Sequence, residues 1–421
     1  MKRFPLLVKW AGLLLMMVML SGCWDQMSIE KMAFVTAVGL DRDEQNKNMV
    51  RVTYVIANPE SGTQAVGGEG GNEPPLETIS FTAEDFNTAK SIANTVIAKR
   101  ISYDLLRVFM VAEDFAQDDD FIRWVYDVTK TPEIRRDVNL LITKEDPATF
   151  VEKNKPKLDT RTHKFYELMF ESGQQTGTLP PSKMNQFFQI TEANANLFLA
   201  MYATTEKSEN EKRLKDSDQF IAGELIYEGE TNTAEFAGSA VFNEGKMIGA
   251  LTVEETRLTY LLNNVLEQPE SIIVSLPDPE TEGQQVGARV KRDGRVNLDM
   301  DLKRDSPSIH ATVPLRLDIL TNHSMENVAE NKETRAKLKK EFEQTFDRKF
   351  AEFVKKTQEE FGAQPFSWSL PARKHFSTIQ EYNDYDWKEM YPKMDVTIET
   401  DITFESFGRQ AKVPEMGEVR D

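Results

Sequence analysis

Two groups of acidic side chains have the residue types that catalysis or ion binding requires. Asp118–Asp120 are three consecutive aspartates, and Asp384 and Asp386 lie among the aromatic residues Tyr382, Tyr385 and Trp387. Paired carboxylates beside aromatic rings suit sugar hydrolysis, whereas a calcium loop places its oxygen ligands at alternating positions. Because adjacent aspartates project in different directions, we interpret Asp118–Asp120 as a solvated helix start. We interpret Asp384 and Asp386 as part of a packed loop edge.

No other motif predicts catalysis. The sequence has no Gly-x-Ser-x-Gly elbow, no His-Glu-x-x-His helix and no Walker loop. The glycine-rich stretch 67–71 has no strand leading into it, and the prolines at 74–75 block a following helix, so it does not resemble a phosphate loop. The histidines are too far apart in sequence for a local metal motif: His163, His310, His323 and His375. We therefore predict no enzyme, no catalytic residue, no cofactor and no metal.

The single cysteine, Cys23, is the residue with the most informative surroundings. It cannot form an internal disulfide or a zinc site built on paired thiolates. Basic residues at 2, 3 and 9 precede an uncharged apolar run at 10–20, WAGLLLMMVML, which leads directly into Ser21, Gly22 and Cys23. A membrane-spanning helix needs roughly 20 apolar residues, so this run is too short to span. Residues 1–22 are predicted to be a cleaved signal peptide.

The tetrad Leu20-Ser21-Gly22-Cys23 resembles the lipobox of bacterial lipoproteins. In those proteins the cysteine thiol, a nucleophile that can form a thioether, receives a diacylglyceryl group, and cleavage leaves the cysteine as the new N-terminus. The alternative is that Cys23 is an ordinary small residue beside an ordinary cleavage site. A complete leader that ends at the only cysteine favours lipidation. Acyl chains such as palmitate contribute about 0.8 kcal/mol per buried methylene, and two of them anchor a protein stably.

The net charge of the chain argues against polyanionic partners. Its 421 residues include 51 Lys and Arg and 69 Asp and Glu, and removal of residues 1–22 leaves 48 and 69, a net charge of −21. Affinity for nucleic acid comes mainly from cations that neutralise phosphates, so nucleic acid is an unlikely partner class. An anionic lipid surface gives no general attraction either, and anchoring falls to the lipid. The basic pairs 135–136 and 339–340 are interpreted as solvated surface.

The amino-terminal half alternates strand and helix patterns. Runs of β-branched and aromatic residues at 33–40 and 49–57 predict a hairpin, and the Gly- and Pro-rich segment 59–76 predicts a surface loop. Further elements are expected as a helix at 84–99, a strand at 105–112, a helix at 114–129 and a strand at 137–143. The polar segment 193–218 suits a linker or an exposed helix and loop.

The carboxyl-terminal half is richer in consecutive strands. Residues 219–228 predict a strand, and 235–255 predict two strands joined at 243–245, followed by a helix that Thr252 and Glu255 begin as a capping box. Leu258, Leu261 and Leu262 would point inward from that helix. Strands are expected at 285–292, 295–303, 309–320 and 394–404, with a tight turn between the first two at 293–294.

A long helix is predicted at 326–361, with Gly362 just beyond its end. Its apolar residues recur at steps of three and four: Leu338, Phe342, Phe346, Phe350, Phe353, Val354 and Phe361. We interpret this stripe as core packing against the sheet rather than a groove for a partner. The predicted class is a mixed α+β fold of three α/β domains with antiparallel-rich sheets. The domains would be 23–192, a small middle domain with a linker at 193–265, and 266–421.

Several blocks of the sequence resemble the Ger(x)C lipoproteins, the C subunits of nutrient germinant receptors in endospore-forming bacteria. The blocks are Cys23-Trp24-Asp25, the strand ending at Asp41, Ile56–Pro59, the segment 238–256 (GSAVFNEGKMIGALTVEET), and Trp387 with Tyr391-Pro392 and a strand ending near Gly408. The loop at 59–76 departs from this pattern as an insertion. The resemblance implies a three-domain protein anchored through Cys23 on the outer face of the spore's inner membrane. It also implies two integral membrane partners, one similar to amino-acid permeases, and no enzymatic residues.

Three functions are therefore compared. The leading one is a non-enzymatic, lipid-anchored receptor subunit required for the germination response. The second is a solute-binding lipoprotein that delivers a nutrient to a membrane transporter, although such proteins typically repeat βα units around a hinge. The third is an envelope hydrolase with carboxylates at catalytic separation.

Overall fold

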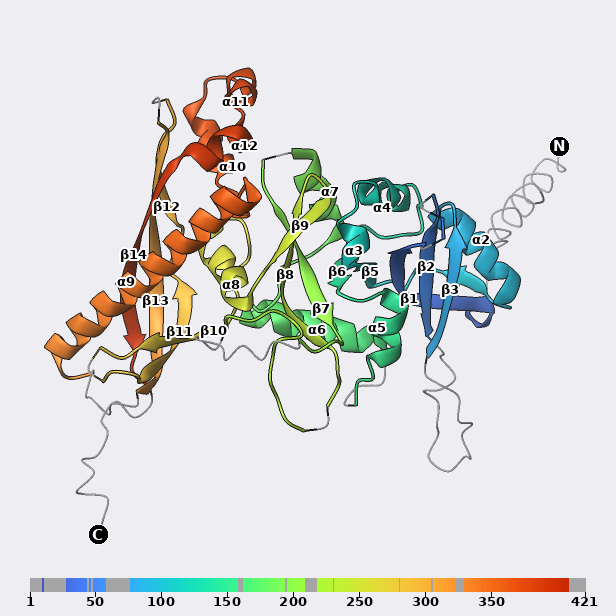
Figure 1. Cartoon of the computed structure of the whole chain (residues 1–421), viewed down its shortest axis with the longest axis horizontal. Coiled ribbons are helices and arrows are strands. Elements are labelled where there is room, and N and C mark those ends of the chain that lie inside the picture. The colour runs from blue at the N-terminus through green and yellow to red at the C-terminus, as the bar shows by residue number, and fades with distance from the viewer. Residues whose placement is uncertain are drawn as a thin grey trace, which may run out of the picture.

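The computed structural model describes residue 10 and residues 28–408 except 44, 47, 58–75, 158–161, 194, 209–217, 230, 280, 304–305 and 323–328. Two sheets lie toward opposite ends of an elongated molecule, with the long helix α9 across the carboxyl-terminal one (Figure 1). The larger sheet has nine strands and the smaller has five. This mixed architecture confirms the predicted α+β class with a long carboxyl-terminal helix.

The larger sheet has parallel strands at its centre and antiparallel strands at both margins. Its order is β3-β2-β1-β5-β6-β7-β8-β9, and β4 pairs with the start of β1. Neighbours from β1 to β7 along this order are parallel, and the remaining pairs in the order are antiparallel. The strands are β1 Met32–Arg42, β2 Val50–Ala57, β3 Leu76–Ala83, β4 Arg100–Ser102, β5 Val108–Ala112, β6 Asn139–Thr143, β7 Phe198–Thr204, β8 Glu235–Asn243 and β9 Lys246–Leu251.

Helices cover both faces of this sheet, so its central strands are apolar on both sides. In β5, Phe109 and Val111 face one core, whereas Val108 and Met110 face the other. The first core includes residues of α2, α3, α4 and α7, and the second includes residues of α5 and α6. These helices are α2 Phe86–Val96, α3 Glu113–Ala116, α4 Phe121–Thr129, α5 Pro147–Lys153, α6 Thr162–Thr176 and α7 Met184–Ala193.

Most predicted elements of this region are confirmed, with three differences. The hairpin of β1 and β2 and the strands β5 and β6 are present, but the helix expected at 114–129 is two helices separated at 117–120. Strands β3 and β4 and helices α5, α6 and α7 are not among the predicted elements. The strand expected at 219–228 is wrong, because that segment has no regular secondary structure. The loop expected at 59–76 lies almost entirely outside the described residues.

The prediction of a linker or exposed helix and loop at 193–218 is wrong for Phe198–Thr204, which form strand β7. All seven residues of β7 are buried, and the strand lies in the middle of the larger sheet between β6 and β8. Its run FLAMYAT is continuously apolar, as a strand covered on both faces requires, but charged residues follow it directly. The sheet therefore continues across residue 193. The division into domains at 23–192, 193–265 and 266–421 stays a prediction.

The smaller sheet is built around its longest strand, β13. Its strands are β10 Ile272–Pro277, β11 Gln285–Arg292, β12 Asn297–Asp301, β13 Ser308–Asn322 and β14 Asp395–Ser406. β14 runs parallel to β13 along one edge, and β11 and β12 run antiparallel to it on the other.

The tight turn predicted at residues 293–294 is wrong, because the chain does not reverse there. β11 pairs with the part of β13 from Leu315 to Asn322, and β12 continues along the part from Ser308 to Thr312. Residues 293–296 therefore form a bulge within one interrupted edge, and the backbone N–H of Asp293 donates to the carbonyl of Pro314 at 2.8 Å. Gly294 allows this bulge because its φ is 98°, a left-handed conformation that other residues adopt at a cost.

Helix α9, Lys332–Lys356, packs its aromatic stripe on the smaller sheet. Asn331 caps its start, and a π-helical turn, Thr357–Phe361, extends it to Gly362, which has the left-handed conformation of a helix C′ residue. The helix thus begins six residues later than predicted at 326, where the chain lies outside the described residues. Every residue of the predicted stripe is buried, which confirms the core interpretation. Short helices α10 Ser369–Ala372, α11 Ile379–Tyr385 and α12 Trp387–Met390 precede β14.

Helix α9 also satisfies part of the outer edge of β14. The carboxylate of Asp347 accepts a hydrogen bond from the backbone N–H of Thr400 at 2.7 Å, and Glu343 accepts one from Ile402 at 3.1 Å. These N–H groups would otherwise be open to pairing with another strand. Two side chains of one helix therefore occupy hydrogen-bonding positions at the exposed edge of the sheet.

Helix α8, Val253–Leu262, joins the two sheets. The predicted capping box is present: the Glu255 N–H donates to the Thr252 hydroxyl at 3.2 Å, and the Thr252 N–H donates back to the Glu255 carboxylate at 2.9 Å. The predicted inward leucines at 258, 261 and 262 are buried in a core that also contains residues of β7, β9 and α9.

Charged contacts fix both ends of α8 to the carboxyl-terminal half. Near its start, Glu254 pairs with Lys349 of α9, and Glu255 pairs with Lys356 at 2.8 Å. At its end, the guanidinium of Arg292 donates to the carbonyl of Asn263 at 2.5 Å. Acidic side chains at the start of a helix and a cation at its end both interact favourably with the helix dipole.

Carboxylates gather at the edge where parallel strands of the larger sheet end. Asp41 lies near the end of β1, Asp114 follows β5 and Asp146 follows β6. Burial raises the pKa of Asp41 to about 6, and the negative charges of Asp114 and Asp146 contribute. The pKa of Asp43, two residues later, shifts in the opposite direction. Hydrogen bonds from the Thr82 hydroxyl and from the backbone N–H groups of Asn46 and Gln45 lower it.

Truncation of one stripe residue tests the packing of α9. Phe342 is fully buried and meets Phe404 of β14 edge to face, with ring centroids 6.3 Å apart. Phe342→Ala should lower the free energy of unfolding by about 3–5 kcal/mol, because it removes a buried ring and leaves a cavity. Urea unfolding followed by circular dichroism measures this change. Glu352→Ala, an exposed position of the same helix, is the control. An equal loss in both variants would contradict the core interpretation.

Substitution of Asp41 tests the cost of its buried charge. Between pH values of about 4 and about 6 the folded chain holds a proton on Asp41 that the unfolded chain releases, so stability falls as pH rises through this range. Asp41→Asn keeps the oxygen that accepts from the Arg42 N–H and removes the charge. It should therefore raise the melting temperature at pH 7 and leave it nearly unchanged at pH 4.

Asp43→Asn is the matched control for this experiment. Because hydrogen bonds lower the pKa of Asp43 in the folded chain, its charge favours folding, and its loss should not raise the melting temperature at pH 7. Stabilisation by Asp43→Asn, or destabilisation by Asp41→Asn at pH 7, would contradict the electrostatic account.

Candidate functional site

The predicted lipidation residue, Cys23, lies outside the described residues. The continuous description begins at Ser28, just before the short helical turn Ile29–Lys31 that leads into β1. Lipidation of Cys23 therefore stays a prediction. Within the described part of the chain, no helix is both long enough and apolar enough to cross a bilayer.

The aspartates of Asp118–Asp120 contact separate cations. Asp118 pairs with Arg42 of β1, Asp119 pairs with Lys246 of β9 at 2.6 Å, and Asp120 pairs with Arg123 at 2.9 Å. Three carboxylates that meet three different partners do not converge on one ligand. This agrees with the prediction that they form a charged surface at the start of a helix.

Asp384 and Asp386 are likewise not brought together as a catalytic pair. Asp384 accepts a hydrogen bond from Gln380 at 2.8 Å, and Asp386 caps α12 by accepting from the Glu389 N–H at 3.2 Å. The neighbouring rings are packed rather than presented to a ligand: Tyr382 and Tyr385 contact Phe376, and Trp387 is buried in the core. The aromatic residues are packed as predicted, but the predicted loop edge is wrong, because Asp384 lies within α11 and Asp386 joins α11 to α12.

The remaining candidates are also dispersed. His310 contacts Thr397 at 2.9 Å and His375 is exposed, whereas the side chains of His163 and His323 lie outside the described residues, as does the glycine-rich 67–71. Among the described residues, no three His, Cys, Asp or Glu side chains are grouped as metal ligands would be. Of the basic pairs, Arg135 forms a bidentate ion pair with Asp137, and Lys339 pairs with Glu343 and Asp401.

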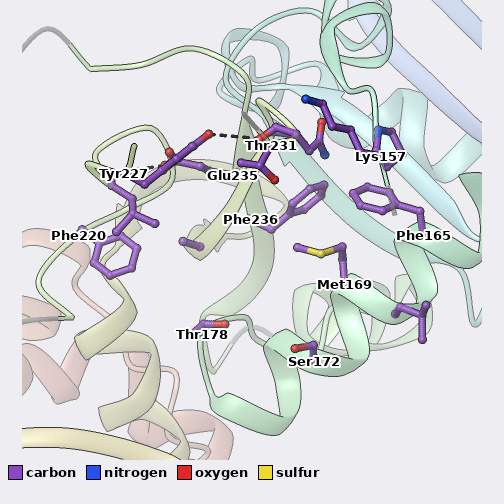
Figure 2. A pocket seen from close by; sticks show the side chains of 16 residues that line it. Lys157, Phe165, Met169, Ser172, Thr178, Phe220, Tyr227, Thr231, Glu235 and Phe236 are labelled. Atoms are coloured by element: carbon purple, nitrogen blue, oxygen red, sulfur yellow. Dashed lines mark hydrogen bonds between the residues drawn. The ribbon is translucent and has the colours of Figure 1, made fainter. Parts of the chain in front are cut away.

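A cavity of about 650 Å³ lies on the α6 face of the larger sheet (Figure 2). Its walls come from two stretches that are distant in sequence: residues 156–178, which include helix α6, and residues 220–237, which include an irregular segment and the start of β8. Phe165 and Met169 of α6 lie toward Phe236 of β8, and Phe220 and Tyr227 line the other side. The volume falls within the range of about 300–1,000 Å³ that is typical of small-molecule sites.

Glu235 holds the irregular wall of this cavity in place. Its side chain is buried at the first position of β8, where one carboxylate oxygen pairs with Lys207 and the other accepts from the Gly223 N–H at 2.6 Å. The Lys207 ammonium also lies 3.9 Å from the centre of the Tyr227 ring, a cation–π contact. The charge of Glu235 is thus compensated within the protein, so it supports the wall rather than awaiting a ligand.

The cavity can bind but lacks the groups for covalent chemistry. Among the described residues that line it, the polar side chains are hydroxyls, an amide, Lys157 and the paired Glu235, with no histidine or cysteine to activate a nucleophile. Most of the lining is aromatic and aliphatic, which suits an apolar molecule or side chain. Leu168 and Leu225 are partly exposed at its margin.

The cavity was not predicted from the sequence. Its irregular wall is predicted to be a strand at 219–228, since the run QFIAGELIYE has strand character. Gly223, with a φ of 93°, is the local signal against a regular strand. Nothing in the sequence indicates that Glu235 would receive the backbone N–H of Gly223, since that contact depends on the fold.

Two family models match the chain. The spore germination protein N-terminal domain matches residues 25–204, and the spore germination B3/GerAC-like C-terminal domain matches residues 237–408. Together they cover both sheets. The first ends with β7, and the second begins within β8, next to Gly238 of the sequence block noted above.

Known proteins are similar to the whole chain or to part of it. Spore germination protein B3 of Bacillus subtilis is 20% identical over 411 residues, covering 96% of this chain and 99% of that protein. Spore germination protein KC of the same organism is 24% identical over 184 residues, covering 43% of this chain and 40% of that protein.

A solved structure supports the architecture. The crystal structure of the GerBC protein superposes with a TM-score of 0.51 at 15% identity, covering 90% of this chain and 100% of that chain, a likeness of fold. The two domain matches, the relatives and this fold agree with the sequence blocks between Cys23 and Gly408. The chain belongs to the GerC family of germinant receptor subunits, whose amino- and carboxyl-terminal spore germination domains it carries.

Proposed function

We propose that this protein is a lipid-anchored, non-enzymatic C subunit of a nutrient germinant receptor and that spores require it for their germination response. The observation that carries the proposal is the single Cys23 directly after a basic and then apolar leader, in a chain that belongs to this family. The family supports a role in spore germination. The leader and its cysteine support the anchor.

Anchoring at Cys23 would hold the molecule by one end. Only four residues separate Cys23 from Ser28, and an extended chain spans at most about 3.6 Å per residue, so the lipid would lie within about 18 Å of Ser28. Ser28 leads into β1, near the end of the molecule opposite the smaller sheet (Figure 1). The larger sheet would therefore be the part nearest the outer face of the inner membrane.

The partners we propose are integral membrane subunits of the receptor, one of them similar to amino-acid permeases. Confinement to the membrane plane raises the effective concentration of the body toward these subunits without any additional contact. Family membership supports association with other receptor subunits. The dispersed aspartates and the compensated Glu235 are in keeping with a binding rather than a catalytic role.

The cavity beside Glu235 is the observation that favours a second candidate, a solute-binding lipoprotein that delivers a nutrient to a transporter. Its volume suits a small molecule. It lies on one face of a single sheet, however, whereas a solute-binding lipoprotein would hold its ligand between two lobes that close around a hinge. The receptor subunit is therefore the function we propose.

Removal of the thiol tests the anchor. Cys23→Ala should move the protein from the membrane to the soluble fraction, because no thioether can form, and intact mass analysis should show no acyl chains. Ser21→Ala keeps both the thiol and a small residue before it and is the matched control, which should stay acylated and membrane-bound. Recovery of Cys23→Ala in the membrane fraction, or an unacylated native protein, would rule the anchor out.

Co-purification tests the partner assignment. The full chain, extracted from spore membranes in mild detergent, should carry permease-like integral subunits with it, and Cys23→Ala should recover less of them because confinement to the membrane is lost. Mass spectrometry of the purified material identifies the subunits. If the acylated wild-type protein brings down no integral germinant receptor subunit, the assignment fails even though the anchor stands.

A further inference from the structure

A second pocket, of about 390 Å³, lies at the amino ends of two neighbouring parallel strands. Arg107 directly precedes β5, Asn139 is the first residue of β6, and α6 forms the opposite wall. The pocket is distinct from the cavity beside Glu235, with which it shares no lining residue. Its lining is mainly polar and carries charges of both signs.

The backbone brings three polar side chains together here. The N–H of Asn139 donates to the carbonyl of Arg107 at 2.9 Å, which fixes the starts of β5 and β6 side by side. Lys183 forms an antiparallel bridge with Asn139. Residues directly opposite in such a bridge have Cβ atoms roughly 5 Å apart and project to the same face. Arg107, Asn139 and Lys183 therefore converge, although 76 residues of sequence separate the first from the last.

Neither cation of the pocket has a compensating charge in contact. Arg107 and Lys183 are both half-buried, and within the described part of the chain neither side chain forms an ion pair or a hydrogen bond. Burial lowers the pKa of Lys183, and the charge of Arg107 acts in the same direction, whereas Asp137 and Glu167 oppose it. The two cations thus have no direct ion pair, although the carboxylates of Asp137, Glu167 and Glu171 also line the pocket.

Asn139 adds an acceptor without a donor. Its side-chain N–H₂ donates to the Arg107 carbonyl at 3.4 Å, which sets the orientation of the amide, and its oxygen is buried with no hydrogen-bond partner among the described residues. A buried acceptor without a donor is unfavourable. A hydrogen-bond donor on a bound molecule would remove that cost.

The acidic side chains of the pocket differ in availability. Asp137 is already engaged in a bidentate ion pair with Arg135. Glu167 of α6 has no ion-pair or hydrogen-bond partner in the described part of the chain, yet its charge acts on Lys183. Glu171, one helical turn later, also lines the pocket and accepts a hydrogen bond from Gln175 at 3.5 Å. The pocket thus contains two cations without a direct ion pair, the carboxylates of Glu167 and Glu171, and an orphaned amide oxygen.

We propose that this pocket binds a small zwitterion, an α-amino acid. Its carboxylate would contact Arg107 and Lys183, and its ammonium group would donate to the oxygen of Asn139 and meet Glu167. An anion without a donor would leave Asn139 unsatisfied and would face Glu167. The inference does not rest on the proposed receptor role, because the binding site is contained within this chain.

Calorimetry on the full chain in mild detergent tests the site, with each proteinogenic L-amino acid as a probe. At least one should give saturable heat at micromolar to millimolar concentration. For the tightest, two matched analogues follow, one lacking the α-ammonium group and one with an amide in place of the carboxylate. Each should bind about tenfold more weakly or worse, because each loses charged hydrogen bonds. The absence of saturable heat with every amino acid, or equal affinity for the analogue without the ammonium group, would overturn the proposal.

Lys183→Met removes the charge while keeping most of the side-chain volume. It should weaken binding of the amino acid with the highest affinity by about tenfold or more and leave the melting temperature unchanged. Lys144→Met is the matched control, because Lys144 lies just beyond the other end of β6 and its ammonium group is 3.9 Å from the carboxylate of Glu206. If Lys183→Met does not fold, Arg107→Met takes its place. Wild-type affinity in the Lys183 or Arg107 variant, or equal weakening in the Lys144 control, would assign the heat to another site.

Discussion

Helix α8 joins the two sheets, because charged side chains of the carboxyl-terminal half contact both of its ends. Glu254 and Glu255 in its first turn meet Lys349 and Lys356 of α9, and Arg292 from β11 donates to the carbonyl just past its last turn. These charges are largely buried, so removal of any one partner would leave another without compensation, which is costly in a low-dielectric setting. The leucines of α8 then fill a core shared with β7 and β9. Helix α8 therefore carries much of the contact between the two halves, and the hydrogen bonds of Gln364 and Ser369 with Asn196 add to it.

Elements with strong local signals were predictable from the sequence, and those that depend on distant neighbours were not. The capping box at Thr252 and Glu255, the stripe of α9 and the hairpin of β1 and β2 are each encoded within a few consecutive residues. All seven residues of β7 are buried, because helices pack on both faces of the sheet at this strand. The charged residues that follow β7 in the sequence made its apolar run hard to identify as a strand. Asp293 and Gly294 carry a turn signal, yet β13 pairs with both flanking strands and keeps the chain straight.

The candidate sites divide in the same way. Cys23 follows from a contiguous leader and needs no structure to be proposed. Glu235 does not, because its partners are the Gly223 backbone and Lys207, and no spacing in the sequence predicts a backbone donor. Arg107, Asn139 and Lys183 look like ordinary surface residues until parallel pairing of β5 with β6 places them together. Their position at the amino ends of the strands adds to the difficulty, since ligands of open α/β sheets are usually sought at the carboxyl ends.

The hydrogen bonds from Asp347 and Glu343 to the rim of β14 have a consequence for crowding. Proteins tethered to a surface diffuse in two dimensions and collide with their own copies often, and an open strand invites such copies to stack edge to edge. Here two backbone N–H groups of β14 already donate hydrogen bonds to Asp347 and Glu343. These acceptors are carboxylates, so the same carboxylates on an approaching copy would be repelled by them. Anchored as we propose, copies of this chain would stay dispersed even when they are densely packed.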